Sequence, residues 1–465
     1  MNTKKRSFLV HLLSFEFILL NVILIIYLSL ILPNIPMGNL SFLQQMLGIT
    51  IFYNISWLII ILSIREKEFY TNSDYGYFKS LFMSLFIFVG IVSIIVSLLN
   101  IRYFELTTFL VPIFIFFILN LISNKYLLRY LKSSGTNHFS NTLLIGYGDE
   151  ILNMNDFSKN LASYGHKIVG FLKANGEKES TTPSFNIEGN INDLENVFAS
   201  NAIDEIFIAT SSLKEEQIEK SIKIADSFGI RVKLIDEKPL HTSNKYKTDT
   251  IGNLAVFNLR QSTLDKFSNV ILKRLFDFFF ALAVIVVFSP VFLLIGILIF
   301  LGCKGKGSIL YTPLRKGEAG KTFKCYKFRT MNVCDDAVNG TKSTAVNDPR
   351  ITPLGKILRK TDLDEMPQFF NVLLGDMSVV GPRPHRTNLQ EDFRKCVSDY
   401  MVRSYIKPGI TGWAQVNGWR GPTLTDEQKN ERIKHDLWYI ENWGFGLDLK
   451  IIFMTIFGKH HQKAF

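Results

Sequence analysis

The chain has 465 residues, too many for one ordinary domain, and hydrophobic residues make up 47% of it. Its net charge of +11 would suit nucleic acid or anionic lipid headgroups, but long uncharged apolar runs near the N-terminus favour lipid, so we expect no nucleic-acid partner. The 4 cysteines form no CxxC or CxxH pair, which argues against a zinc site.

Four apolar segments come first in the chain, and each approaches the roughly 20 residues that a helix needs to cross a bilayer. The segments are residues 8–32, 43–64, 81–99 and 107–123. Lysine and arginine gather before the first segment, between the second and third, and after the fourth. By the positive-inside rule, both ends of this bundle face the cytosol. We therefore predict a membrane α-helical bundle over residues 1–131.

Strand and helix patterns alternate in the middle of the chain. Strands are predicted at residues 142–145, 167–172, 205–209 and 231–235, and helices at 151–164, 194–200 and 213–228. Such alternation predicts a parallel doubly wound sheet, and thus an α/β Rossmann-like domain over residues 141–240. The polar stretch 236–261 is interpreted as a linker.

The turn after the first predicted strand, Gly146-Tyr147-Gly148, invites a dinucleotide-binding interpretation. The third glycine of that fingerprint is missing, because Ile151 stands in its place, and no carboxylate follows the second strand. We therefore expect a scaffold with a regulatory or assembly role rather than a site of NAD chemistry.

A fifth apolar segment, residues 275–302, carries Ser289 and Pro290 at its middle. Proline removes a helical hydrogen bond and clashes with the preceding turn, so a kink or break is expected there. Basic residues on both flanks disfavour a simple crossing, and they are Lys273, Arg274, Lys304 and Lys306. We predict a re-entrant helix-break-helix whose ends both return to the cytosol, with a kinked spanning helix as the alternative.

Two adjacent carboxylates, Asp364 and Glu365, lie shortly before Pro367. Proline is tolerated only near a helix start, so the pair is expected at or just before a helix N-terminus, where free N–H groups attract phosphate. One carboxylate can attack phosphorus as a nucleophile, and the other can hold Mg²⁺. Carboxylates at a helix start are also common caps, so a structural role stays open.

A phosphate site also needs cations, and arginine is suited to bidentate phosphate contacts. The candidates in this part of the chain are Lys327, Arg329, Arg359 and Arg383. Further on, Trp438, Trp443 and the apolar run 447–457 indicate elements at the headgroup level, although core packing explains them equally well.

The C-terminal part resembles the bacterial polyprenyl-phosphate sugar-1-phosphate transferases, which are monotopic phosphoglycosyl transferases. Six motifs carry the resemblance in order: KRLFD from Lys273, FSP from Phe288, YKFRTM from Tyr326, DLDEMPQ from Asp362, GDMSVVGPRP from Gly375 and KPGITGWAQVNG from Lys407. Four predicted spans followed by a Rossmann-like domain look like the long form of that family. This form includes the undecaprenyl-phosphate glucose and galactose phosphotransferases of exopolysaccharide synthesis.

The resemblance implies a two-step reaction at the cytoplasmic face of the bacterial inner membrane. Asp364 would attack the β-phosphate of a UDP-sugar and release UMP, and undecaprenyl phosphate would then take the sugar phosphate from the enzyme. Glu365 would carry Mg²⁺. The implied substrate-binding residues are Lys327, Arg329, Arg359, Arg383 and Arg420, the last standing one position later than in short members.

The resemblance also implies the shape of the last part of the chain. Residues 262–465 would form an α-rich mixed catalytic domain around the re-entrant helix 275–302, with Lys273, Arg274 and Asp277 as its structural anchor. Anionic membrane lipids would be its further partners.

Two other classes of function stay open. A membrane-tethered nucleotide-sugar dehydratase would work in the Rossmann-like part, but Tyr164 is followed by Ile168, so the Tyr-x-x-x-Lys pair is lacking there. A non-catalytic scaffold for polysaccharide assembly would need neither Asp364 nor Glu365. The transferred sugar and a homo-oligomeric state are not decided by the sequence.

Overall fold

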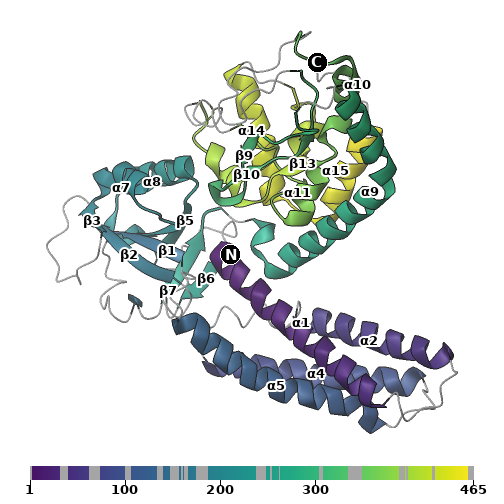
Figure 1. The fold of residues 1–465 in the computed structure, drawn as a ribbon. Helices are drawn as coiled ribbons and strands as arrows, with labels where there is room; N and C mark the ends of the chain where they lie inside the picture. The colour runs from purple at the N-terminus through teal and green to yellow at the C-terminus, as the bar shows by residue number, and fades with distance from the viewer. Residues whose placement is uncertain are drawn as a thin grey trace.

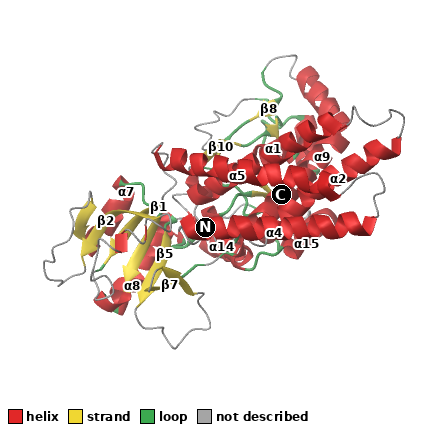
Figure 2. Cartoon of the chain, turned by 90° about the horizontal axis from the view of Figure 1, so that it is seen from below, coloured by secondary structure: helices red, strands yellow, loops and turns green. Residues whose placement is uncertain are grey.

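The computed structural model of the chain has three parts, which Figure 1 shows as a helical bundle, a sheet-containing domain and a larger mixed domain. The structure describes residues 3–31, 40–61, 74–99, 106–133, 140–146, 157–158, 161, 166–173, 187–236, 248–251, 254–260, 262–302, 307–332, 348–386, 393, 396–421 and 425–458. In the view of Figure 2 the sheet again lies to one side of the helical parts.

The described N-terminal residues form four helices: α1 (Thr3–Ile31), α2 (Leu40–Ile60), α4 (Asp74–Leu99) and α5 (Leu106–Ser133). Each contributes buried side chains to one cluster, in which the Trp57 ring lies 5.4 Å from Phe88 and 5.0 Å from Phe116. Large apolar side chains also point outward, and Phe86 is 80% exposed. The four predicted segments are therefore helical, while their position in a membrane stays a prediction.

The middle part contains a seven-stranded sheet with the strand order β3-β2-β1-β4-β5-β7-β6. The strands are β1 (Ser140–Ile145), β2 (His166–Lys173), β3 (Ile187–Asn190), β4 (Glu205–Ala209), β5 (Arg231–Asp236), β6 (Thr248–Ile251) and β7 (Leu254–Asn258). The first five pair in parallel, as the alternating pattern predicts. Helices α7 (Leu194–Ser200) and α8 (Glu215–Phe228) confirm two predicted helices. The predicted helix 151–164 and the residues after Gly146 in the glycine turn lie almost wholly outside the described residues.

The prediction of a linker over residues 236–261 is wrong. The segment carries strands β6 and β7, which pair with each other and extend the sheet antiparallel to β5. Val256 and Phe257 are buried, and Val256 packs with Ile235. The run Leu254–Asn258 is short and has many polar neighbours, so the sequence pattern alone did not indicate a strand. The sheet therefore continues beyond the predicted boundary at residue 240.

Helix α9 (Phe267–Gly302) is continuous, so the expected interruption into two helices is not observed. It carries Pro290 in its interior, and the Ser289 hydroxyl donates to the Val286 carbonyl at 2.8 Å. That carbonyl lies four residues before the proline and lacks its usual N–H partner. Among the described residues, this is the one helix long and apolar enough to span a membrane, with a mean hydropathy of 3.1. A re-entrant path stays a prediction.

The N-terminal half of α9 carries the three residues that the sequence predicts as an anchor. Lys273 Nζ donates to Asp448 Oδ2 at 2.7 Å, and Asp277 Oδ1 accepts from the Val379 amide at 2.9 Å. Arg274 donates to the carbonyls of Val372 and Leu373, which end helix α11 (Gln368–Leu374). These contacts join the helix to three other elements of the same domain.

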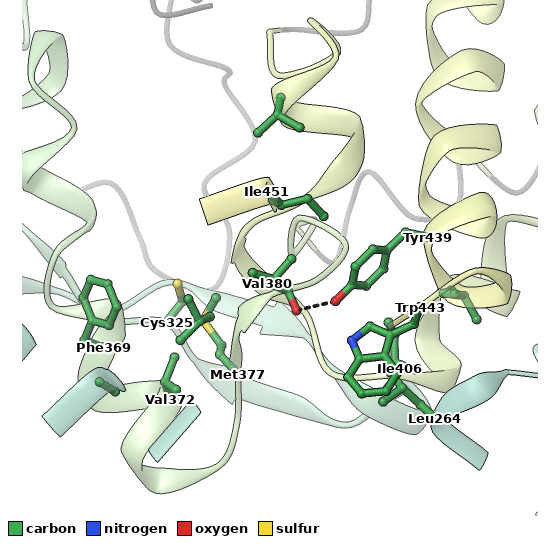
Figure 3. Packing of buried hydrophobic residues seen from close by; sticks show 14 residues of the cluster. Leu264, Cys325, Phe369, Val372, Met377, Val380, Ile406, Tyr439, Trp443 and Ile451 are labelled. Atoms are coloured by element: carbon green, nitrogen blue, oxygen red, sulfur yellow. Dashed lines mark hydrogen bonds between the residues drawn. The ribbon is translucent and has the colours of Figure 1, made fainter. Parts of the chain in front are cut away.

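The rest of the C-terminal domain is α-rich and mixed, as predicted. Its further described elements are β8 (Leu310–Tyr311), β9 (Leu314–Lys316), β10 (Thr322–Lys324), β11 (Lys327–Phe328), α10 (Pro353–Lys360), β12 (Ser378–Val380), β13 (Gly409–Thr411), α13 (Trp413–Val416), α14 (Asp426–Glu441) and α15 (Phe445–Phe457). Figure 3 shows its core, in which the Tyr439 hydroxyl donates to the Val380 carbonyl at 3.2 Å. Trp443 belongs to this core, whereas Trp438 is 42% exposed.

Candidate active site

The two carboxylates lie in a single turn of 3₁₀ helix, η8 (Leu363–Glu365), between α10 and α11. The turn begins after Asp362, whose φ of 57° is left-handed and reverses the chain after α10. Helix α11 then starts at Gln368, directly after Pro367. The predicted position of the pair, just before a helix that begins next to proline, is therefore confirmed.

The Glu365 carboxylate forms ion pairs with two cations. Its Oε1 accepts from Lys327 Nζ at 2.8 Å and from Arg383 Nη2 at 2.6 Å, and its Oε2 accepts from Arg383 Nη1 at 3.1 Å. Burial alone would raise the pKa of this carboxyl, but the Arg383 guanidinium and the Lys327 ammonium hold the pKa well below its usual range. Glu365 therefore stays ionised at any physiological pH.

Asp364 has the opposite environment. Among the described residues, none donates a hydrogen bond to its carboxylate and no cation lies within ion-pair distance of it. Burial raises the pKa of this carboxyl to about 6, and the charge on Glu365 adds to the rise, while Lys327 and Arg359 oppose it. The pKa values of two neighbouring carboxyls are thus shifted in opposite directions, which is typical of groups with separate chemical roles.

The loop after β12 fixes Arg383. Gly381 approaches the next strand so closely that an added Cβ would lie 2.6 Å from the Lys407 carbonyl oxygen, so only glycine fits. Arg403, from the turn η9 (Tyr400–Tyr405), donates to the Arg383 carbonyl at 2.7 Å. Gln415 accepts from Arg383 Nη1 at 3.3 Å. The guanidinium is therefore held at both ends before any ligand binds.

The remaining predicted cations do not all reach the carboxylate pair. Arg359 donates its Nε to Thr330 Oγ1 at 2.9 Å, and its charge acts on Asp364. Arg329 donates to the carbonyls of Met331 and Asn332 in its own loop, and none of these contacts involves Asp364 or Glu365.

Arg420 pairs with an acidic residue that the sequence did not single out. Its two Nη atoms donate to the Asp362 carboxylate at 2.8 and 2.5 Å. Asp362 stands two residues before Asp364, so this pair ties the segment after α13 to the turn that carries both carboxylates. Sequence reasoning missed Asp362 and Gln415, because only the fold brings them to residues distant in the chain. The left-handed turn at Asp362 follows a run of helix formers and leaves no sequence signal of its own.

The carboxylate pair could hold a magnesium ion only together with waters and substrate oxygens. Among the described residues, no cluster of three or more His, Cys, Asp and Glu side chains could hold a metal alone. Magnesium, however, is commonly held by one or two carboxylates together with waters and substrate phosphates. Glu365 Oε2 accepts only one hydrogen bond, at 3.1 Å, so it keeps a lone pair for a metal beside the unpartnered Asp364.

Two family models match the chain. One, described as a bacterial sugar transferase, matches residues 268–461, and so covers α9 and all the site residues above. The other, described as a CoA-binding domain, matches residues 73–235.

Several characterised proteins resemble the chain. The UDP-glucose:undecaprenyl-phosphate glucose-1-phosphate transferase of Klebsiella pneumoniae is 39% identical over 302 residues, which are 64% of this chain and 63% of that protein. Its namesake in Xanthomonas campestris pv. campestris is 31% identical over 357 residues, 75% of this chain and 72% of that protein. A UDP-N-acetylgalactosamine-undecaprenyl-phosphate N-acetylgalactosaminephosphotransferase of Aeromonas hydrophila is 39% identical over 186 residues, 40% of this chain and 43% of that protein. The chain thus spans only part of each relative.

Proposed function

This chain belongs to the bacterial sugar transferase family, and from that premise we propose that it transfers a hexose-1-phosphate from a UDP-sugar to undecaprenyl phosphate and releases UMP. The names of the relatives support the two substrates, and two of the three name glucose as the sugar. Galactose is the alternative that the resemblance of the sequence implies. The product would be the first lipid-linked unit of a surface polysaccharide.

The observation that carries this proposal is the contrast between the two carboxylates. Asp364 has oxygens that no described residue occupies, whereas Glu365 is fixed by Lys327 and Arg383. A carboxylate without hydrogen-bond partners is free to attack phosphorus as a nucleophile. A carboxylate held in ion pairs can instead position a bound group or neutralise its charge. In a non-catalytic scaffold, a buried carboxylate without hydrogen-bond or ion-pair partners would only cost stability.

In the proposed first step, an Asp364 oxygen attacks the β-phosphorus of the UDP-sugar. The bond from that phosphorus to the bridging oxygen breaks, and UMP leaves with the electron pair. A sugar phosphate then remains on Asp364 as an acyl phosphate. In the second step, an oxygen of undecaprenyl phosphate attacks the same phosphorus, and the Asp364 carboxylate is the leaving group. Both steps balance without an oxidant or a reductant.

The cations of the site would orient the donor during these steps. Arg359 acts electrostatically on Asp364, and its Nη atoms have no acceptor among the described residues, so it can take oxygens of the transferred phosphate. Mg²⁺, when bound at Glu365, would neutralise charge on the diphosphate. Lys327 and Arg383 would keep the Glu365 carboxylate ionised and in place.

We also propose that the catalytic domain sits on the cytoplasmic face of the membrane, below a multi-pass N-terminal bundle. Both halves of α9 pack on this one domain: Ala281 belongs to its main core, and Ile295 packs with Phe328 and Leu358. A helix whose two halves both contact one domain fits a re-entrant path better than a full crossing. Exposed apolar side chains on neighbouring helices would enter the same leaflet, and they include Leu374, Phe453 and Phe457.

Purified protein in lipid nanodiscs, given radiolabelled UDP-glucose or UDP-galactose with undecaprenyl phosphate, tests the proposal. We expect label in the lipid fraction together with equimolar UMP. The surface variant Asp426→Asn serves as a control. It should behave as the wild type, because the Asp426 side chain is 70% exposed on α14. Hydrolysis of the UDP-sugar without transfer to lipid, or no reaction with any UDP-sugar, would refute the assignment.

A further inference from the structure

Arg315, the central residue of β9, is a half-buried cation. Among the described residues, no atom accepts a hydrogen bond from its guanidinium. The other arginines of the site each have an acceptor, since Arg383 binds Glu365, Arg420 binds Asp362 and Arg359 binds Thr330. No prediction from the sequence involved Arg315.

Strand pairing places Arg315 close to the active site. β9 pairs antiparallel with β10, and the Arg315 backbone also bridges to Arg386, just beyond the loop that carries Arg383. The electrostatic neighbours of Arg315 include Cys325, Arg386 and Arg383, and Arg383 in turn donates to the Glu365 carboxylate of the site.

The electrostatics of this position call for an anion. Burial lowers the pKa of the Arg315 guanidinium to about 10, and the like charges on Arg386 and Arg383 lower it further than burial alone would. Arg315 still carries its charge at neutral pH, with no carboxylate in contact to offset it. An unpaired charge that is partly removed from water costs free energy, and a bound anion would offset that cost.

The side of the site on which Arg315 lies favours a soluble donor over a lipid. The apolar side is formed by Phe328 and Leu358 against the C-terminal half of α9. The loop of Arg383 is instead held by η9, whose Tyr405 hydroxyl donates to the Ile230 carbonyl of the middle domain at 3.2 Å. Arg315 therefore neighbours a loop that is held by an element in contact with the middle domain.

We infer that Arg315 binds the phosphate of the nucleotide that leaves, and so is a further donor-binding residue of this site. The inference rests on the proposed transfer from a UDP-sugar. When the bond from the β-phosphorus to the bridging oxygen breaks, negative charge develops on the phosphate of UMP. A guanidinium in place before the reaction stabilises that charge through charge-assisted hydrogen bonds.

Binding of UMP and of uridine to the full-length protein in nanodiscs tests this directly, because uridine lacks the phosphate. Arg315→Gln should weaken UMP binding roughly 10- to 100-fold, the range for hydrogen bonds to charged groups, and leave uridine binding unchanged. Arg315→Lys should lose less UMP affinity, because lysine keeps the positive charge but lacks the paired N–H donors of the planar guanidinium. The KM for the UDP-sugar should rise with the loss of UMP affinity, while the KM for undecaprenyl phosphate stays the same.

Three results would overturn the inference. One is wild-type UMP affinity in Arg315→Gln, and another is a rise in the KM for undecaprenyl phosphate alone, which would assign Arg315 to the lipid phosphate. The third is a lower Tm of ligand-free Arg315→Gln, since removal of an unpaired charge should leave Tm equal or higher. Lys434→Gln, at a side chain that is 70% exposed, controls for net charge. An active wild type with an unaffected Arg315→Gln refutes only this inference, whereas an inactive wild type refutes the proposed function.

Discussion

The middle domain surrounds the buried carboxylate of Glu205 with partners, whereas in the catalytic domain the Asp364 carboxylate has no hydrogen-bond partner among the described residues. In the middle domain, Glu205 contacts His166 and Lys233, and it also accepts from Thr142 Oγ1 at 3.1 Å. Burial would raise the pKa of Glu205, but His166 and Lys233 hold that pKa well below its usual range. Asp364 in the catalytic domain has no such neighbours among the described residues, and burial raises its pKa to about 6.

We interpret the charge of Glu205 as one that stabilises the fold and the charge of Asp364 as one that reacts with a substrate. A matched buried cluster contributes to stability only while it is complete, because loss of one partner leaves the others uncompensated. An unmatched group lowers stability and is kept where it reacts or binds. Variants of the two regions should therefore have opposite effects on activity and on stability.

The largest effect is expected for Asp364→Asn. An amide cannot attack phosphorus, so release of UMP without lipid acceptor should fall at least about 1,000-fold, as it does when a nucleophile is removed. The same variant should have an equal or higher Tm at pH 7, because it removes a carboxylate that burial destabilises. Near wild-type turnover would make Asp364 structural, and a clear fall in Tm would remove the contrast with Glu205.

Glu365→Gln should come next, with a loss of roughly 100-fold in turnover. A neutral amide is a poor ligand for magnesium and leaves Lys327 and Arg383 without their counter-charge. Titration with Mg²⁺ should show a weaker dependence in this variant than in the wild type. The exposed Glu427→Gln, on α14, is the matched control. An unchanged Mg²⁺ titration would place the metal elsewhere.

The pH dependence of UMP release should report the unmatched carboxylate. Its pKa is raised to about 6, so below that pH the Asp364 carboxyl is protonated and cannot attack. The rate of UMP release should therefore rise with pH and level off above about pH 7, with a decline of roughly tenfold per unit on the acid side. A rate that stays flat from pH 5 to pH 7 would mean that the carboxyl is already ionised at pH 5.

Glu205→Gln should affect stability and spare the chemistry. Loss of this charge leaves the half-buried Lys233 without its ion pair, so the middle domain should lose about 3 kcal/mol of unfolding free energy. Transfer activity at low temperature should stay within about twofold of the wild type. Denaturant unfolding would measure the loss, with the exposed Glu219→Gln as the control. Equal stabilities of the two variants would show that the buried cluster contributes little.

Expressed as a free energy, the smallest effect is expected from removal of everything before the catalytic domain. A fragment of residues 262–465 keeps Asp364, Glu365 and Arg383, so turnover in nanodiscs should fall only a few-fold. Some loss is expected, because Tyr405 loses its contact with Ile230 and Asp399 loses its ion pair with Arg260 at 2.5 Å. Complete inactivity of a well-folded fragment would show that the upstream domains contribute to the chemistry.

The sequence predicted those features that local patterns encode. The carboxylate pair next to Pro367, the parallel strands of the middle domain and the apolar helix α9 follow from spacing and periodicity. The run Leu254–Asn258 was misjudged, because a five-residue strand has too few residues for its alternation to stand out.

The charge pairing within the site could not be predicted from the sequence. Arg420 was assigned to the substrate, yet it binds Asp362, 58 positions away. The sequence alone does not distinguish Arg315 from Arg383. In the fold, Arg383 pairs with Glu365, whereas Arg315 has no acceptor among the described residues. Which charge is matched depends on contacts between distant segments, and these have no local signature.

The most direct test of the central claim is to trap the sugar phosphate on Asp364. The full-length protein would be mixed with a UDP-sugar in the absence of undecaprenyl phosphate, quenched in acid and digested for mass spectrometry. We predict a mass increase of one hexose phosphate on the peptide that contains Asp364, with UMP released in equal amount, and neither in Asp364→Asn. UMP release that requires the lipid acceptor, or an adduct on any other residue, would contradict the account.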